Sequence, residues 1–566
     1  GAMWDKLIPA QSTSSTSFAH ALMRWGVRLL GVETAAVQPM FAMRIAFTRG
    51  AARQFGGAFL YYHAPNFGDT ATTFTKQQNF AGPDNFFHSR YGATMGPSLS
   101  WYRKSYYLYY MSGAAAIYLE QGFDQFFKPG PGEHDFQLNP LGHITEEFMR
   151  FAEKHPERGS AYTPVAFLLD PAHGWDMTDY PQWPFEVSPL DRGDRALREL
   201  FGVAYYPGLV VEGEPATAER QSFVNGIFGD IFDVLVAADT QSSTAPSSSG
   251  SPTVRKSSAN AAVNASRTAG KLPAPAPVKS EPPTKAELPY EGSNAGTSPA
   301  VLGNSPSSKF VTTASSLPLP SVAPYPLDSY RAIVVGGHIA LSPQWISRLT
   351  DYVKSGGTIV LNAGQIKGLS PELTGVRLLG GNAESDNARC LAPGEVAPDL
   401  SGQMFRYEKL ELKGGQPLIV AENGDSLVTV NHVEKGAVIF CAVTDLLGED
   451  ERITPFAAHL LAHVFADATP LTVTGNVEYL INRNARGWVL TLFNNSGVLK
   501  PQQGLAQVDH NAYVTAGISL RGAEIARAQE WLSDRNLEVN KQPGVPDSVT
   551  VNIPPGGVAI VELQLR

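Results

Sequence analysis

Glu120 is the first residue in this sequence whose position indicates chemistry. It ends the short apolar run Ala114–Leu119, and Gln121-Gly122 follow it. The run is preceded by a helix-length segment with aromatic residues all round, from Trp101 to Met111, and Gly113 allows a break between the two. A helix that feeds a buried strand ending in a carboxylate is how a (β/α) barrel presents a catalytic acid at its C-terminal rim. Glu120 is therefore the primary catalytic candidate.

Other polar residues also follow predicted strands. Glu33 follows the run Leu29–Val32, His63 follows Ala58–Tyr62, and Asp170 follows Val165–Leu169. Because parallel strands end at one shared rim, we predict that Glu33 is a second acid in the site. The residues predicted to bind substrate are His63, Asn66, Asp69, Tyr91, Trp101, Gln121, Asp170, His173 and Trp175.

Each candidate has a structural alternative. Glu120 could instead form a salt bridge with Arg103, Glu33 could cap the following helix, and Asp170 could orient the loop after its strand. For Trp101 a packing role is at least as plausible as sugar binding, whereas Trp175 follows the last strand and is the best aromatic candidate. The histidines at 63, 88 and 173 form no metal-ligand pattern, so we expect neither a metal nor a cofactor.

Residues 1–190 alternate helix and strand, which predicts a portion of a (β/α) TIM-type barrel. We count about four strand–helix units, whereas a closed barrel needs about 250 residues. An open half-barrel would expose two strand edges and an apolar face. We therefore expect a second copy or a second chain to complete it.

Residues 191–468 predict a flavodoxin-like α/β domain. The predicted strands include Val203–Tyr206, Ala332–Val335 and Thr358–Leu361, and Ser342-Pro343 opens a helix that ends at Gly356-Gly357. No glycine-rich phosphate fingerprint accompanies them. The interruption 241–320 is dominated by Ser, Ala, Pro and Thr and predicts a disordered insert.

From residue 470 to 566 the pattern changes to short alternating runs separated by turn residues, as in Asn494-Asn495-Ser496-Gly497. This is typical of an all-β sandwich. Such a domain could bind sugar, although packing beside the barrel is the commoner role.

Composition narrows the choice of partner. The chain of 566 residues has a net charge of −9 and no Lys/Arg cluster, which argues against nucleic acid or an anionic membrane surface. Cys390 and Cys441 have no metal-ligand spacing, and either a buried thiol at Cys441 or a disulfide between the two is compatible with the pattern. The start Gly1-Ala2-Met3 looks like a tag remnant, so the compartment stays open between cytoplasmic and periplasmic or secreted.

The order of barrel, flavodoxin-like domain and sandwich resembles the family-42 β-galactosidases and related clan-A glycoside hydrolases. The resemblance rests on YLEQG with the later LLDPAHGW, and on the stretch from Tyr330 to Leu361, which looks like the trimerisation domain of those enzymes. It implies a retaining mechanism with Glu120 as nucleophile.

This sequence departs from the clan's pattern in two ways. The clan usually has Asn before its acid/base Glu, whereas Val32 precedes Glu33, and the clan's two acids are three strands apart rather than two. These departures indicate a substrate contact for Glu33, with the acid elsewhere. The rival interpretation is a non-catalytic sugar-binding or assembly subunit. An amidotransferase is the weaker third reading, because neither cysteine sits at a strand-to-helix elbow.

Overall fold

The computed structural model describes most of the chain outside the predicted insert 241–320. The described residues are 10–13, 16–35, 41–64, 78–79, 90–91, 98–119, 126–132, 135–174, 192–205, 229–239, 325–400, 402, 404–443, 454–466, 468–500 and 505–566. Among them no helix is long and apolar enough to cross a membrane. Both cysteines are free thiols, and Cys441 is buried as predicted.

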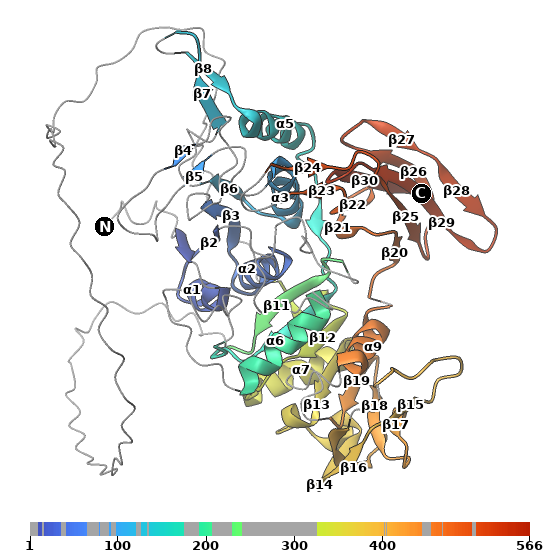
Figure 1. Cartoon of the computed structure of the whole chain (residues 1–566). Helices are drawn as coiled ribbons and strands as arrows, with labels where there is room; N and C mark the ends of the chain where they lie inside the picture. Colours follow the sequence, from blue (N-terminus) through green and yellow to red (C-terminus); the bar gives the residue numbers. More distant parts are fainter. Residues whose placement is uncertain are drawn as a thin grey trace, which may run out of the picture. The chain divides into compact units, whose positions relative to one another are not determined.

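The N-terminal part of the chain forms a small parallel sheet. Its strands, in spatial order, are β1 (Ala10–Thr13), β2 (Leu29–Ala35), β3 (Ala58–Ala64) and β6 (Ala116–Leu119). The helices α1 (Ala19–Arg24), α2 (Phe41–Phe55) and α3 (Leu99–Ser112) connect them (Figure 1). The first three predicted strand–helix units are thereby confirmed. The first helix, α1, is short, because the chain turns at Gly26 with φ of +108°.

The aromatic helix α3 is buried on several sides. It begins where the Ser98 hydroxyl accepts a hydrogen bond from the Trp101 N–H, and it ends at Gly113, whose φ is +100°. It packs on the small sheet, on α5 (Pro140–Lys154) and on the C-terminal strands, which explains its lack of a polar face.

The largest sheet has eight strands. Their spatial order is β11 (Phe232–Val236), β10 (Val165–Leu169), β12 (Ala332–Val335), β13 (Thr358–Asn362), β19 (Gly436–Cys441), β18 (Ser426–Val433), β17 (Gln416–Ala421) and β15 (Ala388–Cys390). The first five are parallel and run 2-1-3-4-5 in chain order, which is the strand order of flavodoxin-like sheets.

This sheet corrects one expectation. The prediction that Val165–Leu169 is a fourth barrel strand is wrong, because β10 pairs with β11 and β12 and not with the small sheet. The predicted boundary at residue 190 thus falls inside the large sheet. No closed barrel is formed among the described residues, where the small sheet has four strands.

Helices cover the large sheet. They are α6 (Arg192–Tyr205), α7 (Pro343–Ser355), α8 (Pro371–Thr374) and α9 (Thr454–Phe465). A strand is predicted at Val203–Tyr206, but its first three residues are the end of α6, where Leu197, Leu200 and Ala204 are buried at helical spacing. The predicted helix start at Ser342 is confirmed, because its hydroxyl accepts a hydrogen bond from the Trp345 N–H. A two-stranded ribbon, β14 (Val376–Ser385) and β16 (Phe405–Leu412), accompanies the sheet.

The C-terminal part contains two antiparallel sheets. One is β20 (Leu471–Thr474), β25 (Val514–Leu520), β29 (Val545–Ile553) and β28 (Val539–Gln542). The other is β27 (Arg535–Leu537), β26 (Ile525–Glu530), β30 (Val558–Leu565), β22 (Gly487–Phe493), β21 (Glu478–Arg483) and β9 (Ser160–Ala161).

The second of these sheets packs against α3 and α5. The Asn482 side chain donates to the Met111 carbonyl at 2.7 Å, and the His155 ring stacks on Trp531 with 4.4 Å between centroids. The antiparallel sheets thus support the N-terminal helices. Three short ribbons complete the described strands: β4 (Gln78–Asn79) with β5 (Arg90–Tyr91), β7 (Phe127–Pro129) with β8 (Phe136–Leu138), and β23 (Val498–Leu499) with β24 (Gln507–Val508).

Candidate active site

Glu33, Tyr62 and Tyr118 share one face of the small parallel sheet. The register pairs Glu33 on β2 with Tyr62 on β3, and Tyr62 with Tyr118 on β6. The two tyrosine rings are in contact, with 5.0 Å between centroids and an angle of 42°. Glu33 and Tyr62 are half-buried and Tyr118 is 51% exposed. The arrangement is a carboxylate beside an accessible aromatic surface, near the carboxyl ends of three parallel strands.

A buried arginine fixes the end of β2. Arg44, in the first turn of α2, donates a hydrogen bond to the carbonyl oxygen of Glu33. The contact ties the strand to the start of the following helix and brings a guanidinium next to the Glu33 backbone. A cation held there favours negative charge in its neighbourhood.

The opposite face of the sheet is packed against helices. Because side chains alternate along a strand, Tyr61 and His63 point away from the Glu33 face. The Tyr61 ring stacks on Tyr109 at 4.1 Å, and the His63 ring lies 5.2 Å from that of Trp101. Burial raises the pKa of Tyr61 well above its usual value, so this phenol stays neutral.

Two predicted substrate-binding residues, His63 and Trp101, therefore lie in the core. His63 is fully buried and Trp101 nearly so. Neither side chain has exposed surface to offer a sugar in this structure. The packing role that the sequence left open for Trp101 is the one that its contacts favour.

Asp170 and His173 follow β10 in the large sheet. The two carboxylate oxygens of Asp170 accept hydrogen bonds from the N–H groups of Ala172 (2.8 Å) and Ala340 (3.2 Å). These bonds hold the loops after β10 and β12, as the structural alternative for Asp170 predicts. The His173 ring lies 5.8 Å from that of Phe47. Phe47 is one turn beyond Arg44 on α2, so the same helix contacts both His173 and Glu33.

The remaining candidates lie outside the described residues or are described only as backbone. Tyr91 belongs to β5. The positions outside the described part are Asn66, Asp69, Glu120, Gln121 and Trp175. Arg103, the alternative partner of Glu120, donates a hydrogen bond to Glu147 at 3.0 Å.

Tyr118 is the residue that sequence reasoning missed. A usable signal was present, because Tyr118 is two residues before Glu120 and positions two apart share a face of a strand. The apolar run Ala114–Leu119 predicts a buried strand, in which Tyr118 would not be accessible. In the structure β6 alternates exposed and half-buried positions.

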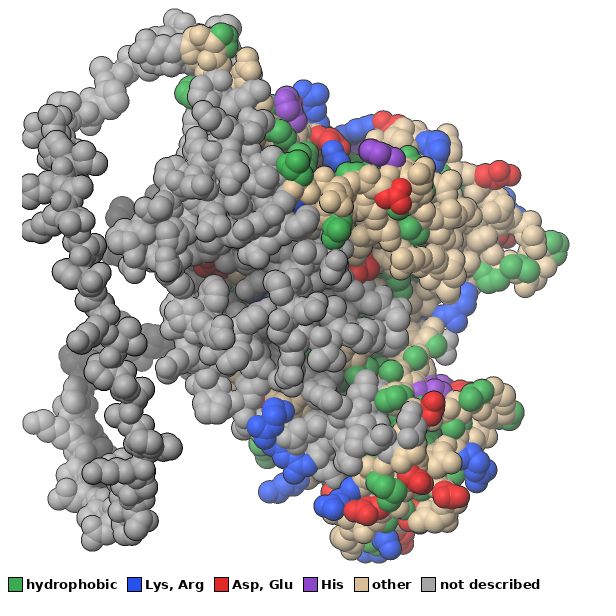
Figure 2. Space-filling view, viewed as in Figure 1, with side chains coloured by type: hydrophobic (Ala, Val, Ile, Leu, Met, Phe, Trp, Pro, Cys, Tyr) green, Lys and Arg blue, Asp and Glu red, His purple; other side chains and the backbone are tan. Residues whose placement is uncertain are grey.

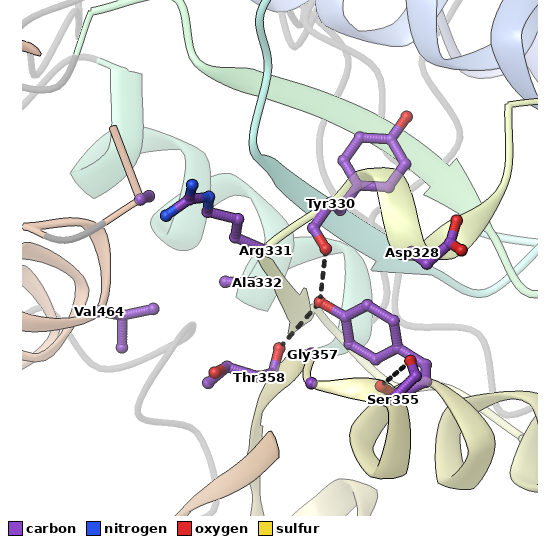
Figure 3. Close-up of a pocket in the computed structure, with 11 residues that line it drawn as sticks. Asp328, Tyr330, Arg331, Ala332, Ser355, Gly357, Thr358 and Val464 are labelled. Atoms are coloured by element: carbon purple, nitrogen blue, oxygen red, sulfur yellow. Dashed lines mark hydrogen bonds between the residues drawn. The ribbon is translucent and has the colours of Figure 1, made fainter. Parts of the chain in front are cut away.

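A cavity of about 410 Å³ lies at a different place, where β12 and β13 begin and α7 ends (Figure 3). The Tyr352 hydroxyl lies within hydrogen-bond distance of the carbonyl oxygens of Tyr330 (3.2 Å) and Thr358 (3.5 Å). Of the residues lining the cavity only Asp328 carries a carboxylate. Ligands of open α/β sheets bind at the carboxyl ends of the strands, whereas this cavity lies where the strands begin. Glycoside hydrolysis by two carboxylates would also need a second acid. The cavity is therefore a poor active-site candidate.

Comparison with known proteins gives remote structural likenesses. No model of a known protein family matches the chain, and neither does any curated protein sequence. Among solved structures it is similar to a β-galactosidase from Bacillus circulans sp. alkalophilus (12% identity, 96% of this chain and 61% of that chain, TM-score 0.47). It is also similar to α-L-fucosidase isoenzyme 2 from Paenibacillus thiaminolyticus (12%, 96% and 66%, TM-score 0.49). A rhamnosidase from Novosphingobium sp. PP1Y is a third neighbour (12%, 96% and 35%, TM-score 0.40).

The chain spans less than two thirds of the length of each of these three proteins. Their names are those of glycosidases. Every TM-score among the three is below 0.5, so the likeness carries no argument about residues or chemistry.

Proposed function

We propose that this protein is a retaining glycoside hydrolase, exo-acting and β-galactosidase-like, that removes terminal sugars from an oligo- or polysaccharide. The observation that carries the proposal is the Glu33, Tyr62 and Tyr118 group on one face of parallel strands. Aromatic rings bind the C–H face of a sugar, and a carboxylate beside them can accept hydrogen bonds from its hydroxyls.

Glu120 is the proposed nucleophile, since it follows Tyr118 by two residues at the end of β6. Its attack on the anomeric carbon would form a glycosyl-enzyme ester, which water then hydrolyses. Glu33 is the proposed second acid. Its strand β2 is two positions from β6 in the sheet, a backbone separation of about 10 Å. The retaining mechanism requires the two carboxyl groups to approach each other to about 5 Å.

The alternative is a non-catalytic sugar-binding or assembly subunit. It is favoured by the small sheet itself, which in the described residues has two free edges, at β1 and β6, in place of a closed barrel. A protein of this kind would bind sugar on the same face of the small sheet, the tyrosine face formed by Glu33, Tyr62 and Tyr118, without cleaving it.

The test is covalent trapping together with turnover. Aryl glycosides of galactose, fucose, mannose and rhamnose are assayed, and a 2-fluoro glycoside of the best substrate is added to accumulate the glycosyl-enzyme. We expect the label on the peptide that contains Glu120. Glu120→Gln should lower turnover by several orders of magnitude, and Glu33→Gln by about 10²–10⁴-fold, because each removes a group that acts on the reacting bond.

Glu153→Gln, which changes an exposed glutamate on α5, is the matched control and should keep full turnover. Sugar binding without turnover or label would support the binding subunit. A label on another residue would assign the nucleophile elsewhere and contradict the role of Glu120.

A further inference from the structure

Sulfur, nitrogen and oxygen donors meet at the edge of the large sheet, far in sequence from the small sheet. The Cys390 Sγ lies 3.5 Å from the His459 Nε2, and this nitrogen lies 3.8 Å from an oxygen of Glu395. These three donor atoms all lie within 4.8 Å of one another. The other oxygen of Glu395 is 3.3 Å from the His463 Nδ1.

Local structure explains why they converge. Cys390 is the last residue of the edge strand β15, where it pairs with Ile419. The chain then turns through Gly394, whose φ is +84°, and brings Glu395 back beside the strand. His459 and His463 are four residues apart on α9 and therefore lie on one helix face.

The cluster is accessible. The side chains of His459, Glu395 and His463 are 27%, 33% and 48% exposed. Figure 2 shows histidine and acidic side chains next to one another on this part of the surface. A dissolved ion could reach these donors without any rearrangement of the core.

The spacing of the donors fits zinc. With Zn–S near 2.3 Å and Zn–N or Zn–O near 2.0–2.1 Å, tetrahedral ligands are about 3.6 Å apart for S and N and about 3.3 Å for N and O. The first value is close to the Cys390–His459 distance of 3.5 Å, and the 3.8 Å between His459 and Glu395 needs only a small closure. Zinc accepts all three of these donor types, thiolate, imidazole and carboxylate. Calcium and magnesium prefer oxygen donors, so the thiolate and the imidazole favour zinc.

We propose that Cys390, Glu395 and His459 bind a zinc ion, with His463 holding the second oxygen of the Glu395 carboxylate. The ion would join the edge strand β15 to α9 across a sequence separation of 69 residues between Cys390 and His459. The site is independent of the proposed glycosidase function, since it uses none of the residues of the tyrosine face.

The sequence by itself predicts no metal site, because Cys390 and His459 are 69 residues apart. The pair His459 and His463, four apart, was the available signal. This pair indicates a metal site only once the fold brings the Cys390 sulfur and the Glu395 carboxylate next to it.

The test measures metal content and ligation on the full chain, purified without a metal-affinity column. Protein stripped with a chelator is reloaded with zinc, passed over gel filtration and analysed for metal, and a second sample is loaded with cobalt. We expect about one equivalent of zinc per chain, a near-ultraviolet thiolate-to-cobalt absorption band, and a higher melting temperature with zinc. Cys390→Ser and His459→Ala should lose the metal and the band.

His463→Ala should weaken zinc binding by about 10–100-fold without abolishing it, as expected for a group that orients a ligand. His432→Ala changes an exposed histidine on β18, two strands away from β15 in the same sheet; it is the control and should bind normally. If the chain binds no zinc, the cluster is only a set of hydrogen bonds and ion pairs, and the proposal fails. Equal binding by the Cys390→Ser chain would also overturn it.

Discussion

At the scale of single residues, His20 on α1 couples folding to pH. Its Nε2 lies 2.8 Å from the Val234 carbonyl oxygen, while its buried Nδ1 has no hydrogen-bond partner among the described residues. Burial lowers the pKa of His20 from the ordinary 6.5 to about 3; the bond to Val234 and the charge of Asp233 raise it, and His173 lowers it further. The folded protein therefore keeps this imidazole neutral.

We predict that stability falls as pH drops from 6.5 toward 3. In this window the unfolded chain protonates His20 and the folded chain does not, so the unfolded state gains up to about 1.4 kcal/mol per pH unit from this residue. Urea unfolding at a series of pH values measures the slope. His20→Gln, which can still donate to Val234, should flatten it, whereas a change at the exposed His432 should not. Parallel curves for His20→Gln and the unchanged protein would refute the prediction.

At the scale of elements, α2 connects the small sheet to the edge of the large one. Gly50 lets the helix backbone approach Val234 on β11, where a side chain would collide with the strand. Beside it the Arg49 guanidinium forms ion pairs with Asp230 at 3.0 Å and with Asp233 at 2.7 Å. The Arg53 guanidinium forms an ion pair with Asp233 at 2.5 Å. Burial by itself would raise the pKa of Asp233, but Arg53 and Arg49 outweigh it and the pKa is lowered. The stabilisation from Asp233 is thus complete above pH 3.8, its ordinary pKa, and is lost as pH falls below it.

Removing the charge of Asp233 should therefore be costly. We predict that Asp233→Asn lowers the free energy of unfolding by about 3–5 kcal/mol, because the buried Arg49 and the largely buried Arg53 lose their shared carboxylate. Glu411→Gln breaks the exposed pair with Arg377 and should leave the free energy of unfolding almost unchanged, because solvent screens such a pair. Urea unfolding at neutral pH compares the two variants. Similar costs would mean that the α2–β11 network adds nothing beyond a surface ion pair.

At the scale of the whole molecule, the edge of the small sheet is a candidate surface for self-association. In the described residues β6 is an edge strand on which Ala116 is exposed, and natural proteins normally pair or cover such an edge. We predict that a second copy covers this edge, so that light scattering gives about twice the chain mass of 60.9 kDa. Ala116→Lys places a charge at the edge and should return the single-chain mass without lowering the melting temperature. A monomeric unchanged protein would exclude self-association, leaving a different chain as the partner.

Local patterns in the sequence determined the elements around the candidate site. The apolar runs before Glu33 and His63 predicted β2 and β3, and the residues Ser98 and Gly113 that cap α3 bracket the aromatic segment that the sequence marks as a helix. These features depend on neighbours within a few residues, so periodicity and capping chemistry suffice to find them.

Tertiary structure alone decided which strands pair and which side chains meet. The continuous apolar run Val165–Leu169 suits either sheet, and only pairing with β11 and β12 assigns it. Alternation along β3 buries His63 and leaves Tyr62 beside Glu33, and Cys390 reaches His459 only through the folding of the large sheet. Strand pairing and side-chain contacts join residues that are far apart in the chain. A local sequence pattern does not specify which distant segment a strand will pair with.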